Sequence, residues 1–587
     1  MASPRGARGS GGKSRGLRRR GGGPVERYLP LAYMVMAVLV VVILLPSALR
    51  PPAQQSTQTA QFSPNAPHQN QQSIIAAFQQ ASSGTAGAGT GNGTAPGVGA
   101  GPPGLQLPPP KGVPNFCPHG FGIPPRQTAD IYSGPCATAW KGNNGGATWQ
   151  GVTGNTIKIC VQGNGAGNNP SANGPVAAQE SASQNAWDRT YTVFQRYFNQ
   201  NFQFYGRQVQ FIVSDPSGSG IAAEQTAAVS CDQQYGVFGA WTGNEPECSY
   251  FGPHGILAFC PGGEEQSYYT DSGPNLWTFS MSGEELSQLT AEWICKQLAG
   301  KDAAWAGEAD YQHTKRKFGL LLYDTRGYQY LGPYMAGLLK SECGVNLDIV
   351  YSDLDTQSGE ASLGQAVTKF KSDGVTSVLI DVDYISSAVF TNDSANEDWF
   401  PEFLDNGGGA LDRNQLASLQ NQTEWAHAFG ITPGAMERPL EDTDCYRSYQ
   451  SVDPANTPAF VFCDYDYDSL YMLMTAIQDA GPDLTPANVE AGLYKLGFRY
   501  PDPPKWAVGG GFAPGRHTYV DDVAMSWWNP TAPPPDPNTY GTASDNVGAY
   551  EYIDIGQRYR PGQMPSTTAP FFASGTTVAP DPTAYGD

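Results

Sequence analysis

Short apolar runs alternate with amphipathic stretches between residues 156 and 381, and no other feature of the sequence constrains the fold as strongly. Apolar runs of this length are typical of buried strands, whereas the stretches between them carry apolar residues at helical spacing. This alternation predicts parallel strands joined by helices that cover both faces of a sheet. The predicted strands are residues 156–161, 209–213, 236–240, 256–259, 318–323, 346–350 and 377–381. The predicted helices are residues 177–201, 221–231, 284–298, a segment near 330–343, and 363–372.

The strand–helix pattern occurs as two runs that separate near residue 282. A chain of 587 residues is long enough for this division, because one domain usually holds roughly 100–200 residues. We therefore expect an α/β fold with two doubly wound lobes.

Residues 28–49 contain no charged side chain and are mostly apolar. As a helix they would be about 33 Å long, close to the hydrocarbon core of about 30 Å. Eight Lys and Arg residues precede this segment and only Arg50 follows closely, so the positive-inside rule predicts a cytoplasmic N-terminus and an exported body. A cleaved signal peptide is the alternative. An uncleaved anchor is favoured, because the apolar run is longer than that of a typical signal peptide.

Two segments have the composition of unfolded chain. Residues 51–110 contain no Asp, Glu, Lys or Arg and are rich in Gln, Gly, Ala, Thr and Pro, which predicts a disordered linker. Residues 566–587 are similarly rich in Pro, Thr and Ala and are expected to form a flexible tail.

All ten cysteines follow the apolar segment, and an even number in an exported chain suggests disulfides. The connectivity stays open, although Cys117–Cys136 and Cys445–Cys463 are plausible local pairs. No C-x-x-C or H-x-x-x-H motif occurs in the sequence, so neither a zinc site nor another cofactor is expected.

Charge excludes one class of function. The net charge is −20, and residues 1–50 carry nine Lys or Arg and one Glu, so residues 51–587 carry −28. A body this acidic repels phosphate backbones, and nucleic-acid binding is therefore not expected.

The sequence Asp464-Tyr-Asp-Tyr-Asp468 is the strongest candidate for a chemical motif. Alternating carboxylates are suited to calcium. They also directly precede a predicted helix, whose N-terminus favours acidic residues. We favour the helical explanation and leave calcium binding or catalysis open as alternatives. The pairs Glu264-Glu265 and Asp521-Asp522 have no identifiable base or nucleophile as partner, so no catalytic residue is predicted.

Several passages occur in the order found in a known family. They are a first strand at residues 151–160, a helix, Asn, Gly-Arg and strand passage at 197–213 followed by Asp215, a helix pair at 468–481 and 484–493, and a closing segment at 556–562. In these passages, residues 150–565 resemble the type I periplasmic binding proteins, particularly the leucine/isoleucine/valine-binding branch of ABC-transporter solute receptors. The resemblance implies two α/β lobes joined by a hinge, with a ligand held in the cleft between them.

Ligands of open α/β sheets lie beyond the carboxyl ends of the strands, so the loops after the predicted strands are the candidate binding loops. By resemblance, Thr242, Gly262 and Gly263 are expected to hold a carboxylate, and Asp383 to pair with an ammonium group. Aromatic residues of the same loops are expected to pack on an apolar part of the ligand. The predicted ligand-binding residues are Trp241, Thr242, Gly262, Gly263, Tyr328, Asp383 and Tyr384.

Glu264 and Glu265 depart from the family pattern. They stand where the family has smaller residues, which favours a cationic or neutral ligand over an amino-acid carboxylate. Residues 112–150 and 501–540 are further additions to the pattern.

The predicted organisation places the solute-binding body outside the membrane. It consists of a basic cytoplasmic tail (1–27), a transmembrane helix (28–49), a linker (50–111), a Cys-containing extension (112–150), a two-lobed domain (151–565) and a tail (566–587). Lobe one is expected to comprise about 151–282 and 440–500, and lobe two about 283–439 and 501–565. The resemblance implies a non-enzymatic, membrane-tethered receptor that captures a small polar molecule, such as an amino acid or amide, for an ABC permease or signalling partner. A surface scaffold or sensor is the alternative, and a surface enzyme is less favoured.

Overall fold

The computed structural model describes residues 130–137, 139–163, 183–214, 221–353, 356–459, 463–500, 507–533 and 548–577. All of them belong to one compact unit, residues 67–587. The predicted tail 1–27, membrane helix 28–49 and linker 50–111 lie outside the described residues. Among the helices that are described, none is long and apolar enough to cross a bilayer.

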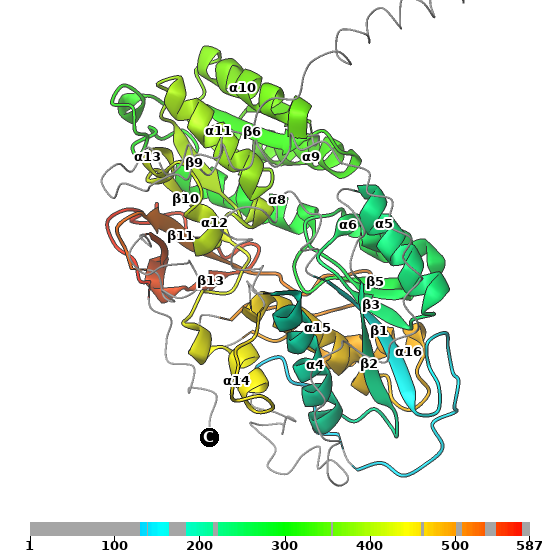
Figure 1. Cartoon of the computed structure of the whole chain (residues 1–587). Coiled ribbons are helices and arrows are strands. Elements are labelled where there is room, and N and C mark those ends of the chain that lie inside the picture. Colours follow the sequence, from blue (N-terminus) through cyan, green and yellow to red (C-terminus); the bar gives the residue numbers. More distant parts are fainter. Residues whose placement is uncertain are drawn as a thin grey trace, which may run out of the picture. The chain divides into compact units, whose positions relative to one another are not determined.

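Lobe one is built on a parallel sheet with the strand order β2-β1-β3-β4-β5. Alternate side chains of a strand point to opposite faces. Ile157 and Ile159 accordingly join the core on one face, and Cys160 joins a separate cluster with Phe251 on the other. Figure 1 shows α4 and α15 on one side of these strands and α5 and α6 on the other. The strands are β1 (Thr156–Gln162), β2 (Gln208–Ser214), β3 (Gly239–Trp241), β4 (Leu257–Phe259) and β5 (Leu276–Trp277). The helices are α4 (Ser183–Asn201), α5 (Ile221–Val229), α6 (Glu245–Phe251), α7 (Gln266–Thr270), α14 (Asp444–Gln450), α15 (Cys463–Asp479) and α16 (Pro486–Leu496).

Lobe two has a larger, mixed sheet in the order β12-β11-β10-β9-β8-β6-β7, with β13 paired to β11. Helices cover both faces of this sheet as well. On one face α10 packs against β6, since a side chain added at Gly319 would contact Phe370. On the other face α9 packs against β6, since a side chain added at Gly332 would contact Leu322. The strands are β6 (Phe318–Tyr323), β7 (Leu347–Ser352), β8 (Ser377–Asp381), β9 (Glu402–Asp405), β10 (Ala428–Thr432), β11 (Val523–Asn529), β12 (Ala549–Tyr552) and β13 (Arg558–Tyr559). The helices include α8 (Gly283–Trp293), α9 (Arg326–Cys343), α10 (Thr356–Ser372), α11 (Tyr384–Asn396), α12 (Asn414–Ala417) and α13 (Gln422–Trp425).

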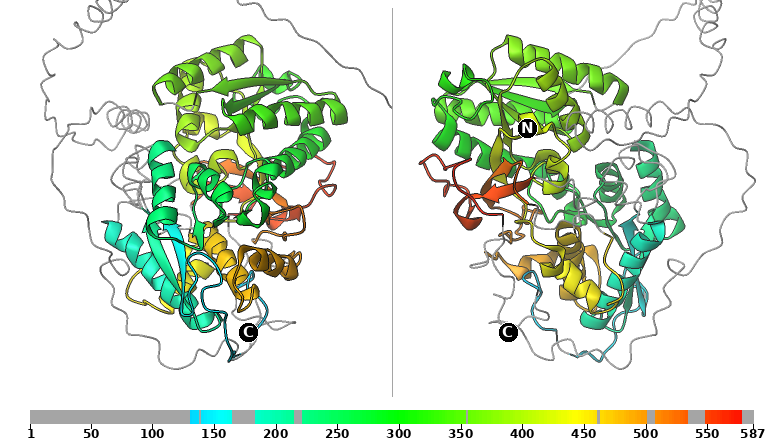
Figure 2. Two further views of the ribbon diagram at one scale, coloured as in Figure 1. Left: turned by 90° about the vertical axis from the view of Figure 1, so that its right-hand side faces the viewer. Right: turned by 60° about the vertical axis from the view of Figure 1, so that its left-hand side comes forward.

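The predicted α/β architecture with parallel sheets is thus confirmed in both lobes. The three C-terminal strands were not predicted. β11 pairs antiparallel with β10, β12 and β13, and Figure 2 shows these red strands beside the rest of the lobe-two sheet in both views.

Within the described residues, the chain crosses between the lobes three times, between β5 and α8, between β10 and α14, and between α16 and β11. The first and third crossings pair with each other, since Thr278 bridges Thr518 and the Tyr519 amide donates to the Ser280 carbonyl over 3.0 Å. Ser282 forms a capping box with Glu285 at the start of α8, and Arg516 of the third crossing binds the same Glu285 carboxylate at 2.6 Å. These two crossings therefore form one hydrogen-bonded hinge.

The terminal segments pack more closely than their composition suggests. Tyr132 of the Cys-containing extension is 1% exposed and packs against Phe279 of the hinge. In contrast to the expected flexible tail, Phe571 is buried in lobe two against Phe429 and Trp305. These segments are ordered because their few large apolar side chains are buried in the core, although their overall composition is typical of loops. Residues 578–587 lie outside the described part.

Disulfides join neighbouring elements within each lobe. They are Cys160–Cys231, Cys248–Cys260, Cys295–Cys343 and Cys445–Cys463. The predicted local pair Cys445–Cys463 is confirmed; Cys136 is also disulfide-bonded, and Cys117 lies outside the described residues. Since none of the four bonds crosses from one lobe to the other, they stiffen each lobe and leave the hinge free.

Candidate functional site

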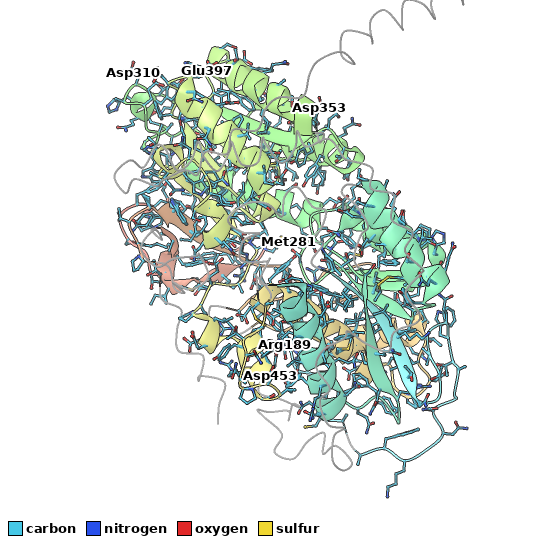
Figure 3. The ribbon with its side chains drawn as sticks, viewed as in Figure 1. Arg189, Met281, Asp310, Asp353, Glu397 and Asp453 are labelled. Carbon is cyan, nitrogen blue, oxygen red and sulfur yellow. A yellow bond between two sulfur atoms is a disulfide. The ribbon has the colours of Figure 1, made fainter. Side chains whose placement is uncertain are left out.

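A cavity of about 1070 Å³ lies in the cleft, and both lobes line it. Its walls are the loops that follow the carboxyl ends of the strands, where ligands of parallel sheets bind. From lobe one these are Gln162, residues 241–243 and residues 260–263; from lobe two they are Asp381, residues 406–410 and residues 433–438. Met281 of the first crossing also lines the cavity, and its label in Figure 3 stands between the two lobes.

Two tryptophans and a glutamine organise the lobe-one wall. Trp187 and Trp241 line the cavity while their side chains are largely buried. The Trp187 indole donates to the Gln162 carbonyl over 3.3 Å, and the Gln162 side chain accepts the Gly243 amide at 2.6 Å. The Thr242 hydroxyl accepts the Asn244 amide at 3.0 Å, so it already holds its own loop.

The glycines after β4 bring this loop against the hinge. A side chain at Gly262 would come within 2.4 Å of the Ser280 Cβ, so only glycine allows the approach. Gly263 has a φ of 91°, and its amide donates to the Met281 carbonyl over 2.9 Å. Both glycines line the cavity, but the Gly263 amide is engaged by the hinge, where the resemblance expects it to face a ligand.

Tyr328, Asp381 and Tyr384 form part of the lobe-two wall. The Tyr328 hydroxyl donates to the Asp381 carboxylate over 3.4 Å, the only hydrogen bond of this carboxylate in the described structure. Burial raises the pKa of Asp381 to about 6.

Asp383 lies elsewhere. Its carboxylate caps α11 and accepts the Ile385 amide at 2.7 Å and the Ser386 amide at 3.1 Å. It is absent from the cavity lining, where Asp381 stands instead. The structure therefore brings together six of the seven predicted residues, and their contact with a ligand stays a prediction. An Asp directly before a helix is a common N-cap, a signal that the sequence does contain.

The first turn of α15 contributes a group of acids to the cavity that the sequence did not place in a cleft. Asp464 and Asp466 occupy this first turn, in agreement with the helical explanation of the motif. Asp464 also pairs with the buried Arg438 at 2.6 Å. The part of the chain that the structure describes holds no group of three or more His, Cys, Asp or Glu residues placed to bind a metal ion.

Arg413 was likewise not predicted, because its neighbours are distant in sequence. It lines the lobe-two wall with its side chain 11% exposed. Its Nη1 donates to the Ala435 carbonyl over 3.2 Å, and its guanidinium lies 5.6 Å from the centre of the Tyr465 ring. Since Tyr465 belongs to α15 of lobe one, this contact spans the cleft.

Glu264 approaches lobe two from the loop after β4. A side chain at Gly327, in the first turn of α9, would come within 2.8 Å of the Glu264 carboxylate. Burial and the nearby carboxylates of Glu245, Glu265 and Asp381 raise the pKa of Glu264 to about 7. The cleft thus opposes an acid of lobe one to an acid of lobe two.

No protein-family model and no curated protein sequence matches the chain. Several solved structures are similar to it, among them two solute-binding proteins of ABC transporters and a leucine binding protein. One, from R. palustris, is in complex with 4-hydroxybenzoate; it has 13% identity and a TM-score of 0.46, over 64% of this chain and 93% of that one. A fatty acid ABC transporter substrate-binding protein from Thermomonospora curvata has 13% identity and a TM-score of 0.49, over 71% and 96%. The leucine binding protein LivK from Thermotoga maritima has 14% identity and a TM-score of 0.45, over 63% and 95%.

These similar proteins belong to the group that the sequence resembles. Because their TM-scores are below 0.5, the likenesses carry no argument about function. Support for a function comes instead from the cavity itself.

Proposed function

We propose that the protein is an extracytoplasmic solute receptor whose two lobes close over a small polar molecule, such as an amino acid, an amide or a similar compound. The observation that carries the proposal is the cavity of about 1070 Å³ lined by strand-end loops of both lobes. Cavities of a few hundred to about 1,000 Å³, with apolar walls and a few polar groups, are typical small-molecule sites.

The construction of the two lobes is suited to closure. Each lobe is stiffened by its own disulfides, whereas the lobes are joined through the hinge around Thr278 and Thr518. A ligand shifts the open–closed equilibrium only if it makes better contacts in the closed form. A cavity lined from both lobes meets this condition, because the second set of contacts forms only on closure.

The proposal also includes a membrane tether and a partner. Residues 28–49 would anchor the protein, with the N-terminus in the cytoplasm, and residues 50–111 would hold the receptor away from the bilayer. An ABC permease, or a signalling partner chain, would receive the ligand. The disulfides support an exported body, since such bonds persist in oxidising compartments.

Thermal unfolding of the full chain tests the proposal against a panel of amino acids, amides, polyamines and aromatic acids. A ligand at a hundredfold excess over its Kd stabilises the folded state by about 2.7 kcal/mol, which gives a clear rise in Tm. Small-angle scattering should then report a smaller radius of gyration. A complete panel without any shift contradicts the receptor proposal and favours a scaffold.

A matched pair of tyrosine variants locates the binding site. Tyr384 lines the cavity, whereas Tyr330 of α9 is 44% exposed and is not among the lining residues. Tyr384→Ala should weaken ligand binding about tenfold, and Tyr330→Ala should leave it unchanged. Equal effects of the two substitutions would place the ligand outside the cleft.

A further inference from the structure

The cavity carries an excess of negative charge. Among the described lining residues, two guanidiniums, of Arg413 and Arg438, face seven carboxylates, which belong to Asp381, Asp412, Glu437, Glu441, Asp464, Asp466 and Asp468. Asp412 pairs with Arg413, and Asp464 pairs with Arg438. A cleft lined by one sign of charge concentrates ligands of the opposite sign.

Asp381 forms no ion pair in the described structure. It lines the cavity and receives one long hydrogen bond, from Tyr328. Across the cleft it faces Glu264, another carboxylate. Two carboxylates from opposite lobes oppose closure unless a positive charge lies near them.

Asp468 is a second cavity-lining carboxylate without an ion pair in the described structure, and it lies at the lobe-one side of the cavity. It is 4% exposed, lines the cavity, and has no hydrogen bond or ion pair with any described residue. Burial and the carboxylates of Asp464, Asp130 and Asp444 raise its pKa well above the usual range, and Arg438 offsets this only partly. A buried carboxylate without a partner is costly, and a cation supplied by a ligand removes that cost.

The remaining walls are apolar and aromatic. The lobe-one wall presents Trp187 and Trp241, and the lobe-two wall presents Leu320, Leu322 and Met335 from β6 and α9. Aromatic faces attract cations, and aliphatic side chains favour a hydrocarbon body.

We propose that the ligand is an organic cation, an amine with an apolar body, whose ammonium group binds among the carboxylates that include Asp381 and Asp468. This inference rests on the proposed receptor function and names its ligand class. An organic anion of the same shape would contact the same apolar walls, but the carboxylates of the cavity would repel its charge.

Calorimetric titration of the full chain at pH 8 with three matched compounds tests the inference. 2-Phenylethylamine, 2-phenylethanol and 3-phenylpropionate share one apolar body and differ in charge. The amine should bind at least tenfold more tightly than the alcohol, and the carboxylate should bind most weakly. In the wider panel, the tightest binder should carry a net positive charge.

Variants that remove a single carboxylate charge test which residues bind the ammonium group. Asp381→Asn and Asp468→Asn should each raise the Kd of the amine about tenfold and leave that of the alcohol within twofold. Both substitutions preserve side-chain shape, and the second one removes a buried charge, so folding should be retained. Glu265→Gln is the control, since Glu265 lies beside Glu264 but does not line the cavity.

Affinity for the amine should also fall as the pH is lowered from 8 to 5. Asp381, with Tyr328 and Glu264 around it, takes up a proton near pH 6. Burial among Asp130, Asp444 and Asp464 raises the pKa of Asp468 as well, and Arg438 opposes this, so Asp468 also loses its charge before an ordinary carboxylate does as the pH falls.

The outcomes separate this inference from the receptor proposal. If the acid or the alcohol binds as tightly as the amine, the ligand is not a cation. If both asparagine variants bind the amine normally, its ammonium group does not bind at these carboxylates. Either result overturns the inference and leaves the receptor proposal standing. If nothing in the panel binds, the receptor proposal fails, and this inference fails with it.

Discussion

The strand-end loops of the two walls differ in how completely their polar groups are bonded. On the lobe-one wall, Gln162 holds Trp187 and Gly243 in place, and Thr242 is bonded within its loop. On the lobe-two wall, Asp381 has a single long hydrogen bond. The difference indicates a division of labour: the strand-end loops of lobe one offer a preformed aromatic platform, whereas Asp381 of lobe two and Asp468 of α15 supply charges that find partners when a ligand is present.

Disulfides offer the strongest test of this division. Cys260 lines the cavity and is bonded to Cys248, whereas the lobe-two bond Cys295–Cys343 contributes nothing to the lining. Loop-closure entropy predicts a loss of about 3 kcal/mol for the first bond and about 4 kcal/mol for the second. Replacing each pair by serines should lower the free energy of unfolding in urea, but only C248S/C260S should weaken ligand binding as well. An equal loss of affinity in both would show that the lobe-one wall is not preformed by its bond.

Buried acids behind the walls should make stability depend on pH. Burial raises the pKa of Glu247 in lobe one from 4.5 to about 7, and that of Glu424 in lobe two to about 9. A carboxyl whose pKa is raised on folding holds its proton more tightly in the folded state, so stability is lost as the pH rises from the unfolded to the folded pKa. The window is therefore about 4.5 to 7 for Glu247 and about 4.5 to 9 for Glu424.

Urea unfolding of glutamine variants at pH 5, 7 and 9 distinguishes the pH ranges over which Glu247 and Glu424 lower the free energy of unfolding. Glu247→Gln should stabilise lobe one at pH 7 and 9 by on the order of 2–3 kcal/mol, with little effect near pH 4.5. Glu424→Gln should gain further stability between pH 7 and 9. A gain that is already complete at pH 5 would show that these carboxyls are not held protonated.

The regular part of the fold was predictable because it depends on local pattern. The strands β6 and β8 match the predicted residues 318–323 and 377–381. The strands β11 to β13 were missed, because β11 joins the sheet by pairing with β10 more than ninety residues away, and β12 and β13 join it only by pairing with β11. The segment around β11 is also rich in Trp and Pro. Sequence pattern cannot report such pairings.

Only those residues of the candidate site that follow the carboxyl ends of strands could be predicted from the sequence. This criterion selected Trp241, Tyr328 and Tyr384, all of which line the cavity. Arg413 and Asp468 were missed, because Arg413 directly precedes α12 and Asp468 lies in α15, and both reach the cleft only through tertiary packing. The sequence does not determine which of Asp381 and Asp383 lines the cleft, because β8 ends at Asp381 and a helix begins three residues later. Asp383 was therefore predicted where Asp381 lies.

The two aspartates at this strand end should give opposite results. Asp383→Ala removes the cap of α11 and should lower the free energy of unfolding by about 1 kcal/mol, without a change in ligand affinity. Asp381→Ala should weaken binding with a smaller loss of stability. Loss of binding in Asp383→Ala, at unchanged stability, would instead support the role that the resemblance assigns to Asp383.

The smallest expected effect concerns the contact across the cleft. The Arg413 guanidinium lies 5.6 Å from the centre of the Tyr465 ring, and partly exposed cation–π contacts contribute about 0.5–1 kcal/mol. Arg413→Met keeps an unbranched apolar stem and removes the charge, so the open form should gain about two- to fivefold in population, as measured by energy transfer between labels on the two lobes. Arg560→Met is the matched control, since Arg560 lies 4.2 Å from the centre of the Tyr500 ring, away from the cavity. If both substitutions shift the equilibrium equally, the contact of Arg413 with Tyr465 does not hold the lobes together, and closure depends on the ligand and the hinge alone.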